Sequence, residues 1–264
     1  MKVGIIGAGN MGGAIAYGLA AGHIVDSGDI CVTCPNRRGE LDKIKAYDQA
    51  VNVSTNNIDA VNGSDIIILA VKPWMLDSVL AELKGTIDFS RQILASVVAG
   101  VELSHYEEYA GTDKKPAIFR IIPNIAISVQ ESMTFIAAKN ASQEQIKAVN
   151  DIFAEMGKVM IVDEYLMGAG SSIASCGIAY ALRYIRAAME GGVELGLSPV
   201  QAQEAVMQTL IGTVKILQVS GNHPESEIDK VTTPGGYTIK GLNAMEKNNF
   251  TTAVIEGLKA SISK

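Results

Sequence analysis

Short apolar runs alternate with segments of helical periodicity over the N-terminal part of the chain. The first run holds Val3, Ile5 and Ile6, and the apolar positions after it recur at helical spacing. A continuous apolar run over residues 65–71 is typical of a parallel strand that is covered on both faces. Further strands are predicted at residues 29–34, 93–98, 117–122, 133–138 and 158–162. This alternation predicts an α/β domain over residues 1–163, with a doubly wound sheet of the Rossmann type.

Two capping boxes mark the starts of helices. Ser142 with Gln145 starts one helix, and Ser198 with Gln201 starts another. Pro199 follows Ser198 at the first helical position, where its missing N–H costs nothing.

Beyond the strand-rich part the chain becomes helical. Residues 171–191 are apolar nearly all round, and the residues that break this pattern, Arg183, Arg186 and Glu190, lie along one narrow stripe. A helix with so little polar surface needs cover on several sides, and another subunit can supply it. We therefore predict an all-α dimerisation domain over residues 164–264. A monomeric helical bundle is the alternative.

The composition is typical of a soluble enzyme. With 264 residues, of which 48% are apolar, the chain can bury a large core. A net charge of −6 and a pI near 5.2 argue against a nucleic-acid partner. The apolar N-terminus is interrupted by glycines too early for a signal peptide, and no apolar run has the length of a membrane span. We expect a cytoplasmic protein with no membrane partner.

Cysteine and histidine spacing predicts neither a redox pair nor a metal site. The three cysteines are an odd number in a chain without an export signal, so we expect free thiols in a reducing compartment. Cys31 and Cys34 lie three residues apart on a predicted strand and so point to opposite faces. The three histidines show no metal-ligand spacing.

The segment after the first apolar run, residues 7–12, reads GAGNMG. This pattern between a strand and a helix is the fingerprint of a dinucleotide-binding βαβ unit. Gly7 permits the tight turn, Gly9 lets the cofactor pyrophosphate approach the backbone, and Gly12 lets helix and strand pack closely. The pyrophosphate would then face free N–H groups at the positive end of a helix. A glycine-rich turn without a ligand is the alternative.

The end of the second predicted strand bears on which dinucleotide binds. A site for NAD usually places Asp or Glu there to accept a hydrogen bond from the ribose 2′-hydroxyl. Here the chain reads Pro35-Asn36-Arg37-Arg38. A guanidinium group pairs well with a phosphate dianion. The sequence therefore favours NADPH over a more weakly bound NADH, with Asn36 and Arg37 as contacts to the 2′-phosphate. A solvated basic turn is the alternative.

Near the C-terminus, residues 231–238 read VTTPGGYT and lead into a helix with apolar residues at Ile239, Leu242 and Met245. Hydroxyl groups and bare N–H groups at a helix N-terminus suit a small carboxylate. Taken alone, the segment is equally well interpreted as a helix cap.

Together these motifs resemble the pyrroline-5-carboxylate reductase family, in the same order and over essentially the whole chain. The family's G-x-G-x-M-G is matched at residues 7–12, and its A-V-K-P at residues 70–73. Its P-N segment after a strand that ends in Arg is matched at residues 120–124. Its signature loop, T-S-P-G-G-x-T, is matched at residues 232–238 and is far more specific than the first motif.

The resemblance implies NADPH-dependent reduction of 1-pyrroline-5-carboxylate to L-proline, the last step of proline biosynthesis. The imine acid would be held by its carboxylate, and the Thr238 hydroxyl would hydrogen-bond the ring nitrogen as the catalytic contact. The substrate-binding residues implied are Thr233, Gly235, Gly236, Tyr237 and Thr238. The cofactor-binding residues implied are Ile6, Gly7, Ala8, Gly9, Asn10, Met11, Gly12, Asn36, Arg37, Asn56, Ala70, Val71, Lys72, Pro73, Val97, Val98 and Ala99. A catalytic Lys72 is disfavoured, because in the family this turn contacts the cofactor mainly through its backbone.

The resemblance also implies a homodimer through the C-terminal helices, with each active site completed by both subunits. Many members of the family assemble further into a homodecamer.

Three departures from the family pattern indicate a divergent member. Ile125-Ala126 stands where the family usually has Thr-Pro, Glu131 stands where glycine is commoner, and residues 175–180 keep only part of a glycine-serine-glycine-proline-alanine-tyrosine stretch. Two alternatives stay open. One is a reductase of another cyclic imine acid or of a β-hydroxy acid, although residues 171–191 lack the helix-borne lysine of hydroxyacid enzymes. The other is an NADP(H)-binding sensor without turnover.

Overall fold

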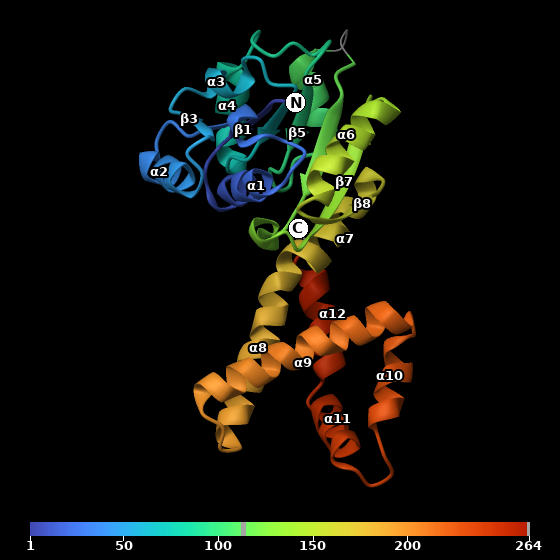
Figure 1. The fold of residues 1–264 in the computed structure, drawn as a ribbon. Helices are drawn as coiled ribbons and strands as arrows, with labels where there is room; N and C mark the ends of the chain where they lie inside the picture. Colours follow the sequence, from blue (N-terminus) through green and yellow to red (C-terminus); the bar gives the residue numbers. More distant parts are fainter. Residues whose placement is uncertain (112–114, 263–264) are drawn as a thin grey trace. The chain divides into compact units, whose positions relative to one another are not determined.

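An eight-stranded sheet frames the N-terminal part of the chain (Figure 1). The structure, a computed structural model, describes residues 1–111 and 115–262. The chain divides into two compact units, Met1–Ser175 and Cys176–Lys264. The strands are β1 (Val3–Ile6), β2 (Ile30–Thr33), β3 (Asn52–Ser54), β4 (Ile66–Leu69), β5 (Ile93–Ser96), β6 (Ile118–Ile122), β7 (Ser132–Lys139) and β8 (Gly157–Ile161).

The strand order is β3-β2-β1-β4-β5-β6-β7-β8, and the neighbours from β3 to β6 are parallel. The chain therefore moves outward from β1 to β3 and then returns to place β4 on the other side of β1, which is the topological switch of a doubly wound sheet. The predicted fold class is confirmed. β7 runs antiparallel to β6 because residues 123–131 are too few for a crossover connection.

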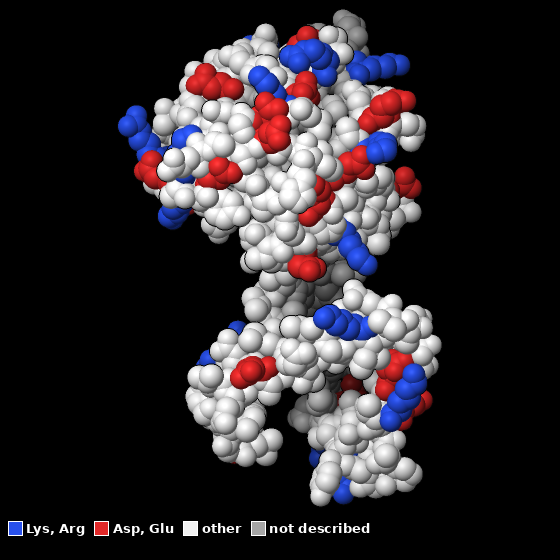
Figure 2. All heavy atoms as spheres, in the orientation of Figure 1, with Lys and Arg blue, Asp and Glu red and all other residues white. Residues whose placement is uncertain are grey.

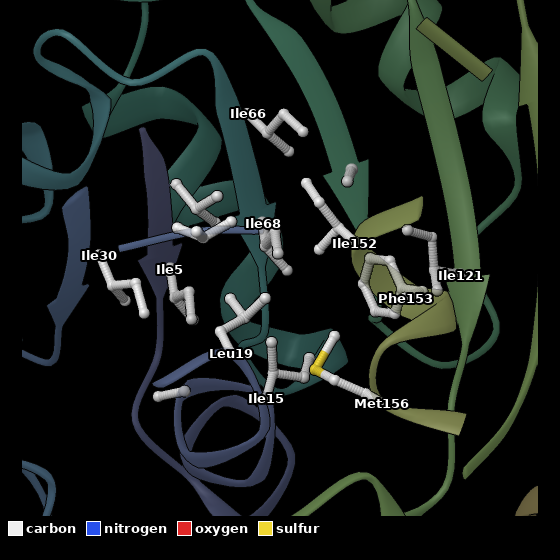
Figure 3. Close-up of a cluster of buried hydrophobic side chains, with 14 of the residues drawn as sticks. Ile5, Ile15, Leu19, Ile30, Ile66, Ile68, Ile121, Ile152, Phe153 and Met156 are labelled. Carbon is white, nitrogen blue, oxygen red and sulfur yellow. The ribbon is translucent and has the colours of Figure 1, made fainter. Parts of the chain in front are cut away.

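Helices cover both faces of the sheet, and each face has its own apolar cluster. The cluster in Figure 3 joins Ile5 of β1, Leu19 of α1 and Phe153 of α6. In β4, Ile66 and Ile68 belong to this cluster, whereas the two residues that alternate with them belong to the other. This explains why β4 reads as one continuous apolar run. The helices of the sheet domain are α1 (Asn10–Ala21), α2 (Arg38–Tyr47), α3 (Asn57–Val61), α4 (Leu76–Glu82), α5 (Leu103–Ala110) and α6 (Gln143–Ala154).

Several short elements were not predicted. β3 is three residues long and lacks an apolar run, so its strand conformation follows from pairing with β2. Short 3₁₀ turns connect some of the larger elements, among them η1 (Ser27–Asp29), η2 (Pro73–Met75) and η3 (Ile125–Val129).

The predicted capping box at the start of α6 is confirmed. The Gln145 backbone N–H donates to Ser142 Oγ at 3.2 Å, and the Ser142 N–H donates to Gln145 Oε1 at 2.9 Å. The helix ends at Ala154. Gly157 begins β8 with φ of +136°, and a Cβ there would lie 2.1 Å from the Ser132 carbonyl oxygen.

The segment after β8 packs on the sheet domain, although the sequence predicted a boundary at residue 163. It forms η4 (Glu164–Leu166), α7 (Met167–Gly170) and the π-helical η5 (Ser171–Cys176). Met167 is completely buried in the cluster beneath α4 and α5. Gly170 packs so closely that a Cβ there would lie 2.6 Å from the Phe135 ring. These contacts place residues 164–175 with the first unit.

The second unit is a set of helices with almost no core of its own. They are α8 (Gly177–Glu194), α9 (Pro199–Ser220), α10 (Pro224–Val231), α11 (Tyr237–Lys247) and α12 (Phe250–Ala260). Within residues 176–262, only Ala202 is buried. Leu182 of α8 is 56% exposed and Val219 of α9 is 89% exposed. Figure 2 shows broad areas of this unit without charged side chains. The apolar periodicity of these helices is therefore not satisfied within one chain.

The predicted single helix over residues 171–191 differs in detail from the structure, because a π-helical segment precedes α8. Of the predicted polar stripe, Arg186 Nε pairs with Glu190 Oε1 at 2.8 Å. The capping box of Ser198 and Gln201 at the start of α9 is confirmed.

The helical stretch Glu164–Glu194 is long and apolar enough to cross a membrane, judged by length and composition alone. The prediction concerned unbroken apolar runs, whereas this stretch reaches that length with polar residues interspersed. Apolar helices that pack against other helices in soluble proteins have the same composition.

Candidate functional site

The turn after β1 is shaped by backbone contacts that only glycine allows. Gly7 has φ of +107°, and its N–H donates to the Thr33 carbonyl at the end of β2 at 2.8 Å. A Cβ on Gly7 would lie 2.6 Å from the carbonyl oxygen of Ala70, just after β4. The turn is thus wedged between the ends of both neighbouring strands, at the switch point of the sheet.

The other two glycines of the motif have opposite surroundings. A Cβ on Gly12 would lie 1.8 Å from the Gly7 carbonyl oxygen, so the first turn of α1 sits directly on the glycine turn. A Cβ on Gly9 would meet nothing within 4 Å. Gly9 is the N-cap of α1, and no side chain caps this helix. The helix start therefore presents open backbone N–H groups, the arrangement that holds a pyrophosphate.

The loops after β4 and β5 lie at the same edge of the sheet. The Ala70 N–H donates to Ile6 O at 2.8 Å, and the Val97 N–H donates to Leu69 O at 2.9 Å. Lys72 is exposed and is the N-cap of η2. The structure thus gathers the predicted loops, 7–12, 70–73 and 97–99, at the carboxyl ends of adjacent parallel strands, where open α/β sheets bind ligands.

The loop after β2 carries the predicted determinants of cofactor choice. Asn36, Arg37 and Arg38 are exposed, and neither arginine forms an ion pair with a carboxylate in the described part of the chain. Arg37 is the N-cap of α2 and Arg38 its first residue. The next acidic residue, Glu40, pairs with Lys43 at 3.1 Å.

Asn56 is exposed and caps α3, because its Oδ1 accepts a hydrogen bond from the Ile58 N–H at 3.1 Å. The neighbouring Asn57 is buried and lies between two other elements. It accepts from Thr33 Oγ1 at 2.9 Å and donates to Glu82 Oε2 at 2.9 Å. Asn57 thereby ties the end of β2 to α4, a role that the sequence does not reveal.

The predicted substrate loop lies between α10 and α11 and is shorter than expected. It spans residues 232–236, because Val231 ends α10 and Tyr237 and Thr238 are the first two residues of α11. Gly235 has φ of +71°, and the Gly236 N–H donates to the Thr233 carbonyl at 2.9 Å.

Gly236 is the N-cap of α11 and has no side chain to cap it. The N–H groups of the first helical turn lack intrahelical acceptors, so they are available to an anion. Tyr237 is 94% exposed, with Lys240 Nζ 5.9 Å from its ring centroid. The Thr238 side chain is also exposed.

The residues that depart from the family pattern are placed as follows. Just before them, Asn124 of the matching P-N segment is buried, accepts from the Ala126 N–H at 3.0 Å and donates to the Ala174 carbonyl at 3.1 Å. Ile125, in η3, is 53% exposed, and Glu131 is exposed. The altered stretch 175–180 spans the end of the π-helical segment and the start of α8.

The cysteines do not form a redox pair. All three are free, and burial raises the pKa of the Cys31 thiol. Cys31 packs against the apolar cluster on the α4 side of the sheet and Cys34 against the cluster on the α1 side. The two thiols thus lie on opposite faces, as the spacing predicted. No group of three or more potential metal-ligating side chains occurs within residues 1–111 and 115–262.

Two family models match the two parts of the chain. The model described as pyrroline-5-carboxylate reductase dimerisation matches residues 164–264, and the one described as NADP oxidoreductase coenzyme F420-dependent matches residues 2–100.

Full-length relatives carry the same name. The pyrroline-5-carboxylate reductase of Synechocystis is 38% identical over 99% of this chain and 96% of its own. Pyrroline-5-carboxylate reductase 2 of Dictyostelium discoideum is 34% identical over 100% of this chain and 91% of its own.

Solved structures agree with these relatives. The Plasmodium falciparum pyrroline carboxylate reductase, solved with NADP bound, has a TM-score of 0.89 at 30% identity and covers 99% of this chain and 95% of that one. A 3-hydroxyisobutyrate dehydrogenase of Mycobacterium tuberculosis, at 14% identity and a TM-score of 0.52, shares the fold alone. The resemblance noted in the sequence is confirmed: this chain belongs to the pyrroline-5-carboxylate reductase family.

Proposed function

We propose that this chain reduces 1-pyrroline-5-carboxylate to L-proline with NADPH, an oxidoreductase reaction on the CH–NH group of a cyclic imine that completes proline biosynthesis. The observation that carries the proposal is the match of the whole chain to relatives of this name. The glycine turn at the sheet edge and the uncapped start of α11 support it with one candidate site each for cofactor and substrate.

The residues at the sheet edge fit a dinucleotide. The open space at Gly9 and the uncapped start of α1 suit a pyrophosphate. Arg37, which pairs with no carboxylate among the residues that the structure describes, suits a 2′-phosphate. No carboxylate directly follows β2, where one would repel that phosphate. When bound, the nicotinamide supplies the hydride. We propose that residues 6–12, Asn36, Arg37, Asn56, 70–73 and 97–99 hold NADPH, and NADH more weakly.

The loop before α11 is proposed to hold the imine acid. Its carboxylate would contact Thr233, Gly235, Gly236 and the Tyr237 N–H, where the helix start favours negative charge. The Thr238 hydroxyl would hydrogen-bond the ring nitrogen. A protonated imine already accepts hydride well, so the loop supplies orientation and carboxylate capture rather than a strong acid.

We propose that the protein works in the cytoplasm as a homodimer through α8–α12. The exposed apolar side chains of these helices support this, because a single subunit would leave them in water whereas a partner subunit would cover them. Packing between subunits would also explain why the stretch Glu164–Glu194 is apolar, without placing it in a membrane. A homodecamer is the larger assembly to look for by mass measurement in solution.

Oxidation of NADPH with racemic 1-pyrroline-5-carboxylate tests the proposal. It is run beside NADH as cofactor and beside pyrroline-2-carboxylate as substrate. We expect fast turnover with 1-pyrroline-5-carboxylate and preference for NADPH. Turnover only with the other imine would redirect the proposal to a different substrate. Binding of NADPH without turnover on either imine would support a sensor instead, and would direct attention to Ile125 and residues 175–180.

A further inference from the structure

The connection from β5 to α5, residues 97–102, contains the segment proposed to line the cofactor. At its start, the Val98 N–H donates to the Ser96 Oγ at 3.2 Å, and Ser96 Oγ lies 2.6 Å from the Tyr106 hydroxyl of α5. Within it, Gly100 has φ of +77° and a Cβ there would meet nothing within 4 Å. The middle of the connection is thus open, and its conformation depends on how its two ends are fixed.

The far end is fixed by a residue distant in sequence. Glu164 Oε1 accepts the N–H of Leu103, the first residue of α5, at 2.7 Å. No side chain from within the helix caps α5. A carboxylate at a helix N-terminus is favourable because it satisfies a free N–H and meets the positive end of the helix dipole. Glu164 therefore caps α5 from η4.

Arg120 holds Glu164 in place. Its Nη1 donates to the same Oε1 at 3.2 Å, and its side chain is 14% exposed. Arg120 lies on β6 directly beside Ser96 in the strand register. Tyr106 completes the group: its hydroxyl is buried, and desolvation raises its pKa to about 12, so it is neutral and serves as a hydrogen-bond partner. The Ser96–Tyr106 pair and the Arg120–Glu164 pair, which are adjacent through the pairing of β5 with β6, thus hold the two ends of the 97–102 connection.

We propose that Arg120 and Glu164 are positioning residues that set the conformation of the 97–102 connection for NADPH. Neither residue is in the cofactor set proposed above. The inference rests on the proposed function, because it assumes that this connection lines the cofactor. According to this inference, Arg120 and Glu164 influence cofactor affinity and turnover in addition to stabilising the fold.

The chain offers a matched control on the same helix. Glu107 of α5 also accepts from a cation, Lys139 Nζ at 2.6 Å, and from a second donor, Asn140 Nδ2 at 3.1 Å. The side chains of Glu164 and Glu107 are 33% and 32% exposed. Glu107→Ala therefore breaks a comparable pair on α5 without touching residues 97–103.

The experiment compares Glu164→Ala, Glu164→Gln and Arg120→Lys with Glu107→Ala in the full chain. Three quantities are measured: NADPH affinity by titration, amide hydrogen exchange of residues 97–103, and kcat and KM for each substrate. For Glu164→Ala we expect faster exchange in this segment and a ten- to hundredfold loss, roughly, in NADPH affinity and kcat together, because displacements near 1 Å have effects of that size. Glu164→Gln keeps an acceptor for Leu103 and should lose less, as should Arg120→Lys. The KM for the imine should change little.

Glu107→Ala should leave NADPH affinity and exchange of residues 97–103 at wild-type values. The inference is overturned if Glu164→Ala lowers the melting temperature as Glu107→Ala does but leaves NADPH affinity and kcat unchanged. It is also overturned if both variants weaken NADPH equally. Wild-type protein that binds NADPH yet reduces no imine would refute the proposed function instead. The titration and exchange measurements would still decide the role of the pair.

Discussion

Replacing Gly12 by alanine tests whether the close packing of α1 on the glycine turn is required. The new Cβ would lie 1.8 Å from Gly7 O, 3.0 Å from Gly7 C and 3.1 Å from Ala70 Cβ. Cβ atoms essentially never come within 3.0 Å of such neighbours, so helix and turn would have to separate by about 1.2 Å. The backbone fixes the position of the Cβ, and the atom it clashes with is a backbone oxygen, so no side-chain rotation can relieve the clash. We expect a loss of about 3 kcal/mol in the free energy of unfolding.

The adjacent Gly13 provides the control. It is buried in the same helix, but a Cβ there would come no closer than 3.8 Å, to Ala8 O. Gly13→Ala should therefore be neutral or stabilising by about 0.5–1 kcal/mol, because alanine is the better helix former. Thermal unfolding should separate the two variants by about 10 °C at this chain length.

NADPH titration provides the second assay for these glycines. Gly12→Ala should bind at least about tenfold more weakly, because the helix start proposed to face the pyrophosphate would move. Gly13→Ala should bind as wild type. A Gly12→Ala protein with wild-type melting temperature and NADPH affinity would refute the reasoning, since the clash would then have been relieved without consequence.

Three further variants test other parts of the proposal. Arg37→Ala should weaken NADPH binding by about 1.5–3 kcal/mol, the scale of a charge-assisted hydrogen bond, and leave NADH binding nearly unchanged; equal losses in the two titrations would exclude a 2′-phosphate contact. Thr238→Ala should lower kcat/KM for the imine roughly tenfold, the net value of one hydrogen bond, at unchanged NADPH affinity; an equal fall in NADPH affinity would rule out the imine contact. A chain ended at Asp163 should aggregate more than one ended at Ser175, because it lacks the buried Met167 and leaves an apolar gap worth about 2–4 kcal/mol. Equal solubility and melting temperature of the two fragments would contradict that role of the segment.

The glycine turn at the proposed cofactor edge of the sheet could be predicted because its signals are local. Gly7 and Gly12 are close in sequence. Their roles follow from the steric limits of a strand–turn–helix unit, and the structure has these limits at both positions. The continuous run of β4 likewise reports burial on both faces without reference to any other element. The capping boxes that start at Ser142 and Ser198 each depend on only two residues, three positions apart in the sequence.

The supporting residues of the site could not be predicted in the same way. Glu164 caps α5 across 61 residues of sequence, and Arg120 is joined to it across 44. A lone Glu after one strand and a lone Arg within another have no spacing that marks them as partners. The direction of β7 could be assigned only once the ends of β6 and β7 were known, because the short connection between them does not allow parallel pairing.

The sequence by itself determined the fold class, the glycine turn, the basic loop after β2 and the apolar excess of the C-terminal helices. Each follows from short-range sterics, from charge, or from the period at which apolar residues recur. Only the tertiary structure decided that residues 164–175 pack with the sheet domain, through Met167 and Gly170, and that Glu164 meets Arg120 and α5. Those outcomes depend on which distant surfaces the folded chain brings into contact, and no local periodicity encodes that.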